Sequence, residues 1–230
     1  HSEPWTPFRL RAALIAAGIP AAAISIYPTD HEGVTALLEN FGRGMIFGQA
    51  STVEAHANNP NIQVHGPGYS KMVVGSDWIE SWEEHLDLMV DSVLENGGRS
   101  CINTSTIVVP RYGRILAEAL AARLGSVVAL PLTHPDSQLA AVASRHGAEA
   151  VAQHIAGLTG DGVVDCSRPY GPPVQQVDGL FFLRPTVLWC SDSSNPLAKT
   201  EYPFPFVSVV EIPEEAIGAW LGPTLVLSLL

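Results

Sequence analysis

Positions 94–104 read Leu-Glu-Asn-Gly-Gly-Arg-Ser-Cys-Ile-Asn-Thr. The pair Gly97-Gly98 is expected to end an amphipathic helix, and Cys101 follows it just before a β-branched strand. A thiol on such a sharply turned, exposed backbone can be reached by a substrate. Nearby backbone amides and the Asn103 side chain could then donate hydrogen bonds to an oxyanion. The alternative is that Cys101 is a small buried core residue, because free cysteine is among the most buried residue types.

The composition is that of a globular protein with an acidic surface. The chain has 230 residues, of which 47% are hydrophobic and 15% charged, enough for one large domain or parts of two. Lys and Arg number 12 against 23 Asp and Glu, a formal net charge of -11. This balance argues against a nucleic-acid partner, because phosphate backbones are bound by basic patches.

The three cysteines bear on the cellular compartment. Cys101, Cys166 and Cys190 have neither disulfide-framework nor zinc-knuckle spacing, which favours a reducing, cytoplasmic location. No apolar run reaches the ~18 residues of a membrane span, and the first residues do not resemble a signal peptide, so we expect no membrane partner. His146 and His154 lack an acidic ligand at helical spacing, and we predict no metal site.

Helical and strand patterns alternate along the chain, which predicts an α/β fold with a parallel sheet. The expected helices cover residues 6–17, 33–40, 76–93 (capped by Ser76 and Asp77), 114–124, 137–145, 149–158 and 214–220. The expected strands cover residues 23–27, 44–48, 71–75, 104–109, 163–166, 181–183, 186–189, 206–210 and 224–229. A shift towards Gly, Pro and Tyr from Val64 onward places a domain boundary near Gly68.

Three segments resemble one known family. Asn96-Gly97-Gly98-Arg99-Ser100-Cys101 is similar to the catalytic-cysteine segment of the aldehyde dehydrogenase superfamily. In the same order as in that family, His65-Gly66-Pro67-Gly68-Tyr69-Ser70-Lys71 resembles its glycine-rich segment, and Glu201-Tyr202-Pro203-Phe204-Pro205-Phe206 resembles its Glu-x-Phe-Gly-Pro segment. The resemblance implies that residues 1–67 are the C-terminal part of a Rossmann-like NAD(P)-binding domain. Residues 68–230 would be a catalytic domain, incomplete at its C-terminus, of a longer protein that forms a homo-oligomer.

The resemblance also implies a cofactor, NAD or NADP, although no GxGxxG or Walker-type loop is present. Glu3 matches the residue that binds the adenine ribose, and Glu201 matches the glutamate that holds the nicotinamide ribose. A carboxylate suits both positions because it can accept from two vicinal hydroxyls. Further cofactor contacts are expected from Phe47 and Gly48, from Gly68 in the glycine-rich segment, and from Phe204, which replaces the usual glycine. For Glu3 a solvated position at a helix start is the alternative.

The implied reaction is attack of the Cys101 thiolate on a small-molecule aldehyde, followed by hydride transfer to NAD(P) and release of the acyl group. His65 stands where hydrolytic members carry a glutamate base, and histidine can take a proton near neutral pH. His65 would then activate water. Alternatively the base is lost and coenzyme A accepts the acyl group, or the reaction runs backwards as an acyl-CoA reductase. His65 could also be a loop residue without a role, and a noncatalytic scaffold member with a structural Cys101 remains open.

Overall fold

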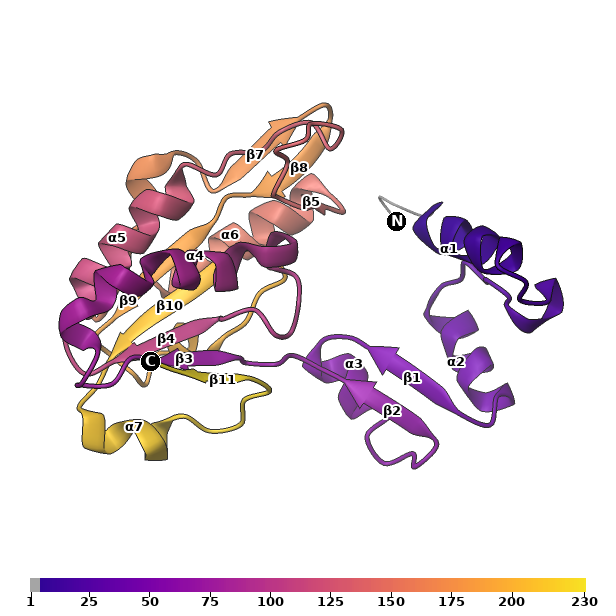
Figure 1. The fold of residues 1–230 in the computed structure, drawn as a ribbon, viewed down its shortest axis with the longest axis horizontal. Coiled ribbons are helices and arrows are strands. Elements are labelled where there is room, and N and C mark those ends of the chain that lie inside the picture. The colour runs from indigo at the N-terminus through magenta and orange to yellow at the C-terminus, as the bar shows by residue number, and fades with distance from the viewer. Residues whose placement is uncertain (1–4) are drawn as a thin grey trace. The chain divides into compact units, whose positions relative to one another are not determined.

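The computed structural model describes residues 5–230. The chain forms two compact units, His1–Pro67 and Gly68–Leu230 (Figure 1).

Within residues 5–67 the first unit forms three α-helices, a short 3-10 turn and one pair of strands. In chain order the α-helices and strands are α1 (Trp5–Ala16), α2 (His31–Asn40), β1 (Gly44–Phe47), α3 (Ala50–Glu54) and β2 (Ile62–His65). β1 and β2 run parallel, and Phe47 lies opposite His65. The side chain of Asp30 caps α2 by accepting a hydrogen bond from Gly33 N. Parallel pairing places the carboxyl ends of both strands at the same edge.

One expectation for this unit is wrong, and two of its elements were not predicted. The strand expected over residues 23–27 is absent: Ala21–Ala23 form a 3-10 turn and the following residues pair with no neighbouring strand. A β-branched sequence does not make a strand without a partner to supply its hydrogen bonds. β2 and α3, conversely, were not predicted.

The second unit is built on a six-stranded sheet with the order β11-β3-β4-β10-β9-β6. Its strands are β3 (Lys71–Val73), β4 (Thr106–Val109), β6 (Val163–Asp165), β9 (Thr186–Cys190), β10 (Phe206–Glu211) and β11 (Leu227–Leu229). All neighbours run parallel except β6, which is antiparallel to β9. The predicted α/β class with a parallel sheet is therefore confirmed.

Helices cover both faces of this sheet (Figure 1). α4 (Leu86–Leu94) and α5 (Gly113–Gly125) contribute to one core cluster together with Ile107 and Val109 of β4. α6 (Arg145–Leu158) and α7 (Glu214–Trp220) contribute to a second cluster with Val108. Successive residues of β4 thus face opposite layers, and the strand is buried along its whole length.

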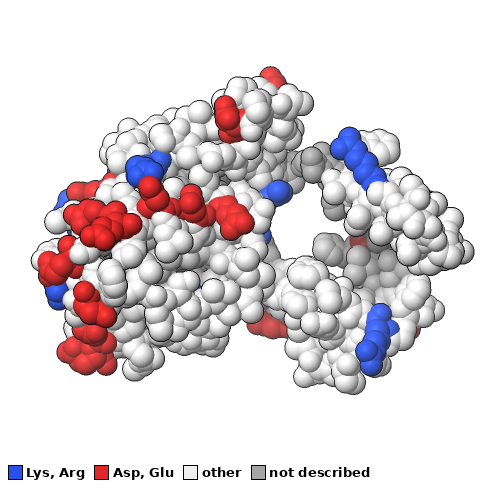
Figure 2. Space-filling view, viewed as in Figure 1, with Lys and Arg blue, Asp and Glu red and all other residues white. Residues whose placement is uncertain are grey.

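A separate three-stranded antiparallel sheet has the order β5-β8-β7. Its strands are β5 (Ala141–Val142), β7 (Val174–Val177) and β8 (Leu180–Leu183). The helix expected over 137–145 is wrong, because this segment supplies β5, which pairs with β8. The helix that follows is α6, capped by Ser144, whose hydroxyl accepts from Gly147 N. On the viewed face of the second unit, acidic side chains gather in patches, mostly towards the left, and outnumber the basic ones (Figure 2).

The helix expected after Ser76 and Asp77 begins differently. Ile79–His85 form 3-10 turns and regular α-helix starts only at Leu86. Ser76 does not cap this segment, and its hydroxyl instead hydrogen-bonds to Glu214.

Candidate active site

Cys101 lies in a turn that the preceding glycines shape. After α4 ends at Leu94, the segment Glu95–Gly98 holds Asn96, Gly97 and Gly98 at φ values of 53°, 64° and 68°. Glycine relieves the strain of this left-handed run. Gly98 also approaches the Glu201 segment closely, since a Cβ added there would lie 2.2 Å from Pro205 N. The glycine pair therefore lets the Cys101 segment pack directly against the Glu201 segment.

Asn103 holds the turn from inside. It is buried; its Oδ1 accepts from Ser100 N at 2.8 Å, and its Nδ2 donates to Ser92 O and Glu95 O at 3.0 Å each. A side-chain amide has two N–H donors, and both are engaged. The expectation that Asn103 donates to an oxyanion is thus wrong, and its role is to fix the backbone around Cys101.

Gly68 and Ser70 contact Cys101 from the start of β3. A Cβ at Gly68 would lie 1.8 Å from Cys101 O, so only glycine allows this approach. Ser70 Oγ donates to the same carbonyl at 2.8 Å. The carbonyl side of Cys101 is therefore anchored, whereas its N–H makes no hydrogen bond within residues 5–230.

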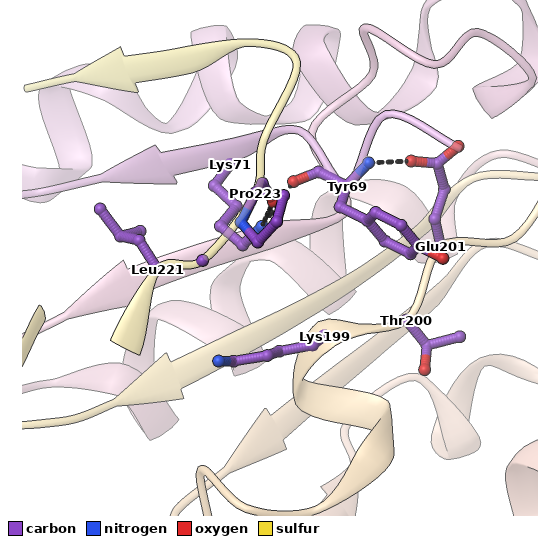
Figure 3. Close-up of a pocket in the computed structure, with 8 residues that line it drawn as sticks. Tyr69, Lys71, Lys199, Thr200, Glu201, Leu221 and Pro223 are labelled. Atoms are coloured by element: carbon purple, nitrogen blue, oxygen red, sulfur yellow. Dashed lines mark hydrogen bonds between the residues drawn. The ribbon is translucent and has the colours of Figure 1, made fainter. Parts of the chain in front are cut away.

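Glu201 is tied to the same segment. One carboxylate oxygen accepts from Tyr69 N at 2.6 Å, across 132 positions of sequence (Figure 3). Burial raises the pKa of Glu201, while the backbone amides of Tyr69 and Gly68 and the charge of Lys71 lower it. Tyr69 itself has a φ of 47°, a left-handed conformation that these contacts hold. Of the predicted site residues, the structure thus brings together Cys101, Gly68 and Glu201.

Phe204 has a different position. Its side chain is 4% exposed and packs with Tyr202 and Phe206, at ring-centroid distances of 5.9 and 6.1 Å. A ring buried in this way offers almost no surface to a cofactor. It supports the Glu201 segment from within the core instead.

Three predicted residues meet in the first unit. The rings of Phe47 and His65 stack at 4.6 Å with an angle of 16°, and Gly48 N donates to His65 O at 3.0 Å. They lie at the carboxyl ends of β1 and β2, the edge at which parallel sheets usually bind ligands. Within residues 5–230, His65 Nε2 has no hydrogen-bond partner. Glu3 lies outside the described residues.

The three thiols differ in their surroundings. Burial raises the pKa of Cys166 to about 11, and the carboxylates of Glu118 and Asp165 add to this. Burial likewise raises the pKa of Cys190 to about 12. Cys101 is partly exposed. Neither Cys166 nor Cys190 is therefore suited to act as a thiolate near neutral pH.

A cavity of about 350 Å³ lies beside Glu201. It is lined by Tyr69, Lys71, Lys199, Thr200, Glu201, Leu221, Gly222 and Pro223 (Figure 3). Sequence reasoning missed Lys71 and Lys199, although one signal was present: the chain contains no other lysine.

Within residues 5–230, no three His, Cys, Asp or Glu side chains are grouped so that they could hold a metal ion. No helix in the same range is long and apolar enough to cross a membrane.

Comparison with solved structures identifies the architecture. Aldehyde dehydrogenase from Brucella melitensis biovar abortus 2308 has a TM-score of 0.76 at 22% identity, over 95% of this chain and 46% of the other. A putative aldehyde dehydrogenase from Burkholderia cenocepacia has a TM-score of 0.78 at 18% identity, over 95% and 46%. The NAD+ complex of aldehyde dehydrogenase from Bacillus cereus has a TM-score of 0.75 at 19% identity, over 94% and 45%. The chain thus spans less than half the length of these proteins.

Comparison with curated proteins found no match. The sequence model of the aldehyde dehydrogenase family, however, matches residues 1–218, almost the entire chain. With the shared architecture and the assembled cysteine, glycine and glutamate segments, this match shows that the chain belongs to the aldehyde dehydrogenase family.

Proposed function

We propose that the protein oxidises an aldehyde with NAD or NADP through a covalent intermediate on Cys101. The observation that carries this proposal is the convergence of three distant segments. Ser70 reaches the Cys101 carbonyl across 31 positions, and Tyr69 reaches Glu201 across 132. A thiol whose backbone is fixed from both sides is held in place for attack on a carbonyl carbon.

The residues of the turn have distinct roles in this chemistry. The Cys101 sulfur would bond to the carbonyl carbon, and the unpaired backbone N–H of Cys101 would donate to the oxyanion that forms. NAD or NADP, when bound, would accept a hydride from that carbon. Asn103, Gly68 and Ser70 would keep the turn rigid while the sulfur carries the acyl group.

We assign residues 1–67 to the C-terminal part of the NAD(P)-binding domain and residues 68–230 to the catalytic domain. The chemistry of Glu201 fits a ribose. An ionised carboxylate has about four acceptor positions, and the amides of Tyr69 and Gly68 occupy only part of that capacity. Phe47 suits a flat cofactor group because the residue is 68% exposed and its ring is held by stacking on His65.

Release of the acyl group has two candidate routes. In the first, His65 accepts a proton from water; its Nε2 has no hydrogen-bond partner within residues 5–230 and is buried, so this route requires water to enter beside the ring. In the second, coenzyme A accepts the acyl group and no base is needed. Histidine keeps the capacity for proton transfer at position 65, where hydrolytic members carry glutamate, so we place the hydrolytic route first.

The proposal is tested by trapping the intermediate. The full-length protein is incubated with NAD+ and a panel of short aliphatic and aromatic aldehydes, quenched in acid and digested. Mass spectrometry should find an acyl adduct on the Cys101 peptide. Cys101→Ser should abolish both the adduct and NADH formation, whereas the control Cys166→Ser should retain both. Undiminished NADH formation by Cys101→Ser would refute the proposal.

A further inference from the structure

The distribution of lysine is unusual. The chain contains two lysines, Lys71 and Lys199, and both line the cavity beside Glu201 (Figure 3). The chain as a whole carries a formal charge of -11, whereas this cavity is lined by both of its lysines.

Lys71 is a buried ammonium without an ion pair. Its side chain is among the largest fully buried ones, at 2% exposure. Its Nζ donates to Tyr69 O at 2.7 Å and to Pro223 O at 3.1 Å, and within residues 5–230 no carboxylate lies within ion-pair distance. An ammonium has three N–H donors, so one remains. Burying such a charge without a counter-ion is costly.

Lys199 adds a second cation. Its Nζ lies 4.3 Å from the centre of the Trp220 ring and donates to Trp220 O, which leaves two N–H donors. Burial lowers the pKa of Lys71, and repulsion from Lys199 lowers it further, while Glu201 raises it. The two ammonium groups therefore repel each other, and both side chains line the same cavity (Figure 3).

Glu201 does not neutralise both lysines. Its carboxylate accepts hydrogen bonds from backbone amides of the Gly68-Tyr69 segment, which already draw on its charge. The lining thus has two cations and one carboxylate, and within residues 5–230 three ammonium N–H donors have no hydrogen-bond partner.

We propose that this cavity binds a small organic oxyanion, a carboxylate or a phosphate, between the ammonium groups of Lys71 and Lys199. An anion there would accept charge-assisted hydrogen bonds and offset the repulsion between the two lysines. Lysine acts as a point charge without the planar geometry of arginine, so either oxyanion suits the pair. Leu221 and Pro223 supply an apolar wall for the rest of the molecule, and about 350 Å³ is typical of a small-molecule site.

This site shares Glu201 with the proposed cofactor site, but its test is independent of the proposed aldehyde oxidation. Neither Cys101 nor His65 lines the cavity, and anion binding is measured without aldehyde or NAD(P). Failure of one proposal therefore leaves the other standing.

The two lysines allow a direct test. In the 230-residue chain labelled with 13C at lysine Cε, only Lys71 and Lys199 give signals. Inorganic phosphate and acetate are titrated separately, with chloride used to keep the ionic strength constant. With at least one of the two anions, both signals should shift and saturate with one shared Kd. The anion whose titration saturates shows whether the cavity prefers a phosphate or a carboxylate.

Variants separate binding from general charge screening. Lys199→Met should weaken the Kd by about 10- to 100-fold, the range expected when a charge-assisted hydrogen bond is lost. Arg123→Met also removes one positive charge, but Arg123 lies on α5 and forms an exposed ion pair with Asp87 of α4, so this change should alter the Kd less than about twofold.

Three outcomes would overturn the proposal. They are shifts that saturate with neither anion, a Lys71 signal that stays fixed while the Lys199 signal moves, and an unchanged Kd in Lys199→Met. The wild-type Lys71 signal reports on the buried lysine directly, so the test needs no substitution at that position.

Discussion

Cys101 differs from the other two thiols in what surrounds it, and alkylation can measure the difference. Brief, limiting iodoacetamide treatment at pH 8 should label Cys101 first. Because burial raises the pKa of Cys166 to about 11, roughly one in a thousand of its thiols is ionised at that pH. The fraction is smaller for Cys190, whose pKa is raised to about 12. Labelling of both should increase as the pH rises towards these values, and mass-spectrometric mapping reads out all three sites. Faster labelling of Cys166 than of Cys101 at pH 8 would count against the nucleophile assignment.

His65 separates the two release routes. In the full-length enzyme, His65→Ala should leave a pre-steady-state burst of NADH intact, because hydride transfer precedes release of the acyl group. If His65 is the base, steady turnover should fall by ~10²–10⁴. If coenzyme A is the acceptor, turnover with coenzyme A present should barely change. His146→Ala is the matched control, since His146 is exposed on α6. Loss of the burst itself would contradict both routes.

The sequence identified the segments that form the candidate site, but it did not identify all the contacts that their side chains make. Cys101, Gly68 and Glu201 were found by motif, and the structure brings them together. Asn103 was given the wrong partners, because the carbonyls of Ser92 and Glu95 become available only through the way α4 ends. Lys71 was missed because lysine is almost never fully buried, and no local pattern marks the exception.

Among the elements, the turns around Cys101 depend on glycines that allow close backbone approach. At Gly68, an added Cβ would lie 1.8 Å from Cys101 O, and backbone atoms cannot move aside as a flexible side chain can. Gly68→Ala should therefore destabilise the protein by about 1–3 kcal/mol and slow alkylation of Cys101. Gly157→Ala is the control: nothing lies within 4 Å of its added Cβ in α6, and a gain of about 0.5–1 kcal/mol is expected. Urea unfolding measures both, and an unchanged midpoint in Gly68→Ala would show that the segment is not tightly packed.

The start of α5 has a cap supplied from another element. Tyr112 precedes the helix at a φ of 62° without a side-chain cap, and Gly113 N donates instead to Glu211 Oε2 of β10 at 2.7 Å. Glu211→Ala should cost about 0.5–2 kcal/mol in thermal or urea unfolding, as for other lost caps. Glu211→Gln should cost less, because an acceptor remains and only the charge at the helix N-terminus, worth about 0.3–1 kcal/mol, is lost.

Glu118→Ala serves as the comparison for the cap. Glu118 forms an exposed i,i+4 pair with Arg114 in the same helix, and its loss should change stability by no more than about 0.5 kcal/mol. Equal effects of Glu118→Ala and Glu211→Ala would show that Glu211 does not cap α5.

Prediction of the elements succeeded where the pattern and the packing agree. β4 and β10 are apolar runs buried on both faces of a parallel sheet, and both were found. The helix expected over 137–145 failed because Ala141 and Val142 pair with Phe182 and Phe181 of β8, a long-range contact that overrides the local preference of alanine for helix. Hydrophobic periodicity describes one segment at a time, so it does not predict which strands pair with each other.

The two units of the molecule differ in how much apolar surface they bury. Within residues 5–67 no residue is fully buried, whereas both core clusters lie in residues 68–230. Local opening is easiest where few apolar contacts must be broken. Amides of β1 and β2 should therefore exchange with deuterium well before those of β4, β9 and β10 in hydrogen-exchange mass spectrometry. Equal protection of β1 and β10 would contradict this.

The same measurement tests whether the first unit takes part in cofactor binding. If Phe47, Gly48 and His65 contact NAD or NADP, a saturating cofactor concentration should slow exchange at the carboxyl ends of β1 and β2, because ligand binding stabilises the closed state by mass action. Hydrogen exchange is followed in parallel at the Gly68-Tyr69 segment, because a ribose bound at Glu201 should slow exchange there as well. Phe47→Ala should remove most of the protection at β1 and β2 because the exposed ring is the largest contact surface there. Full protection in Phe47→Ala would show that the cofactor binds without this edge of the sheet.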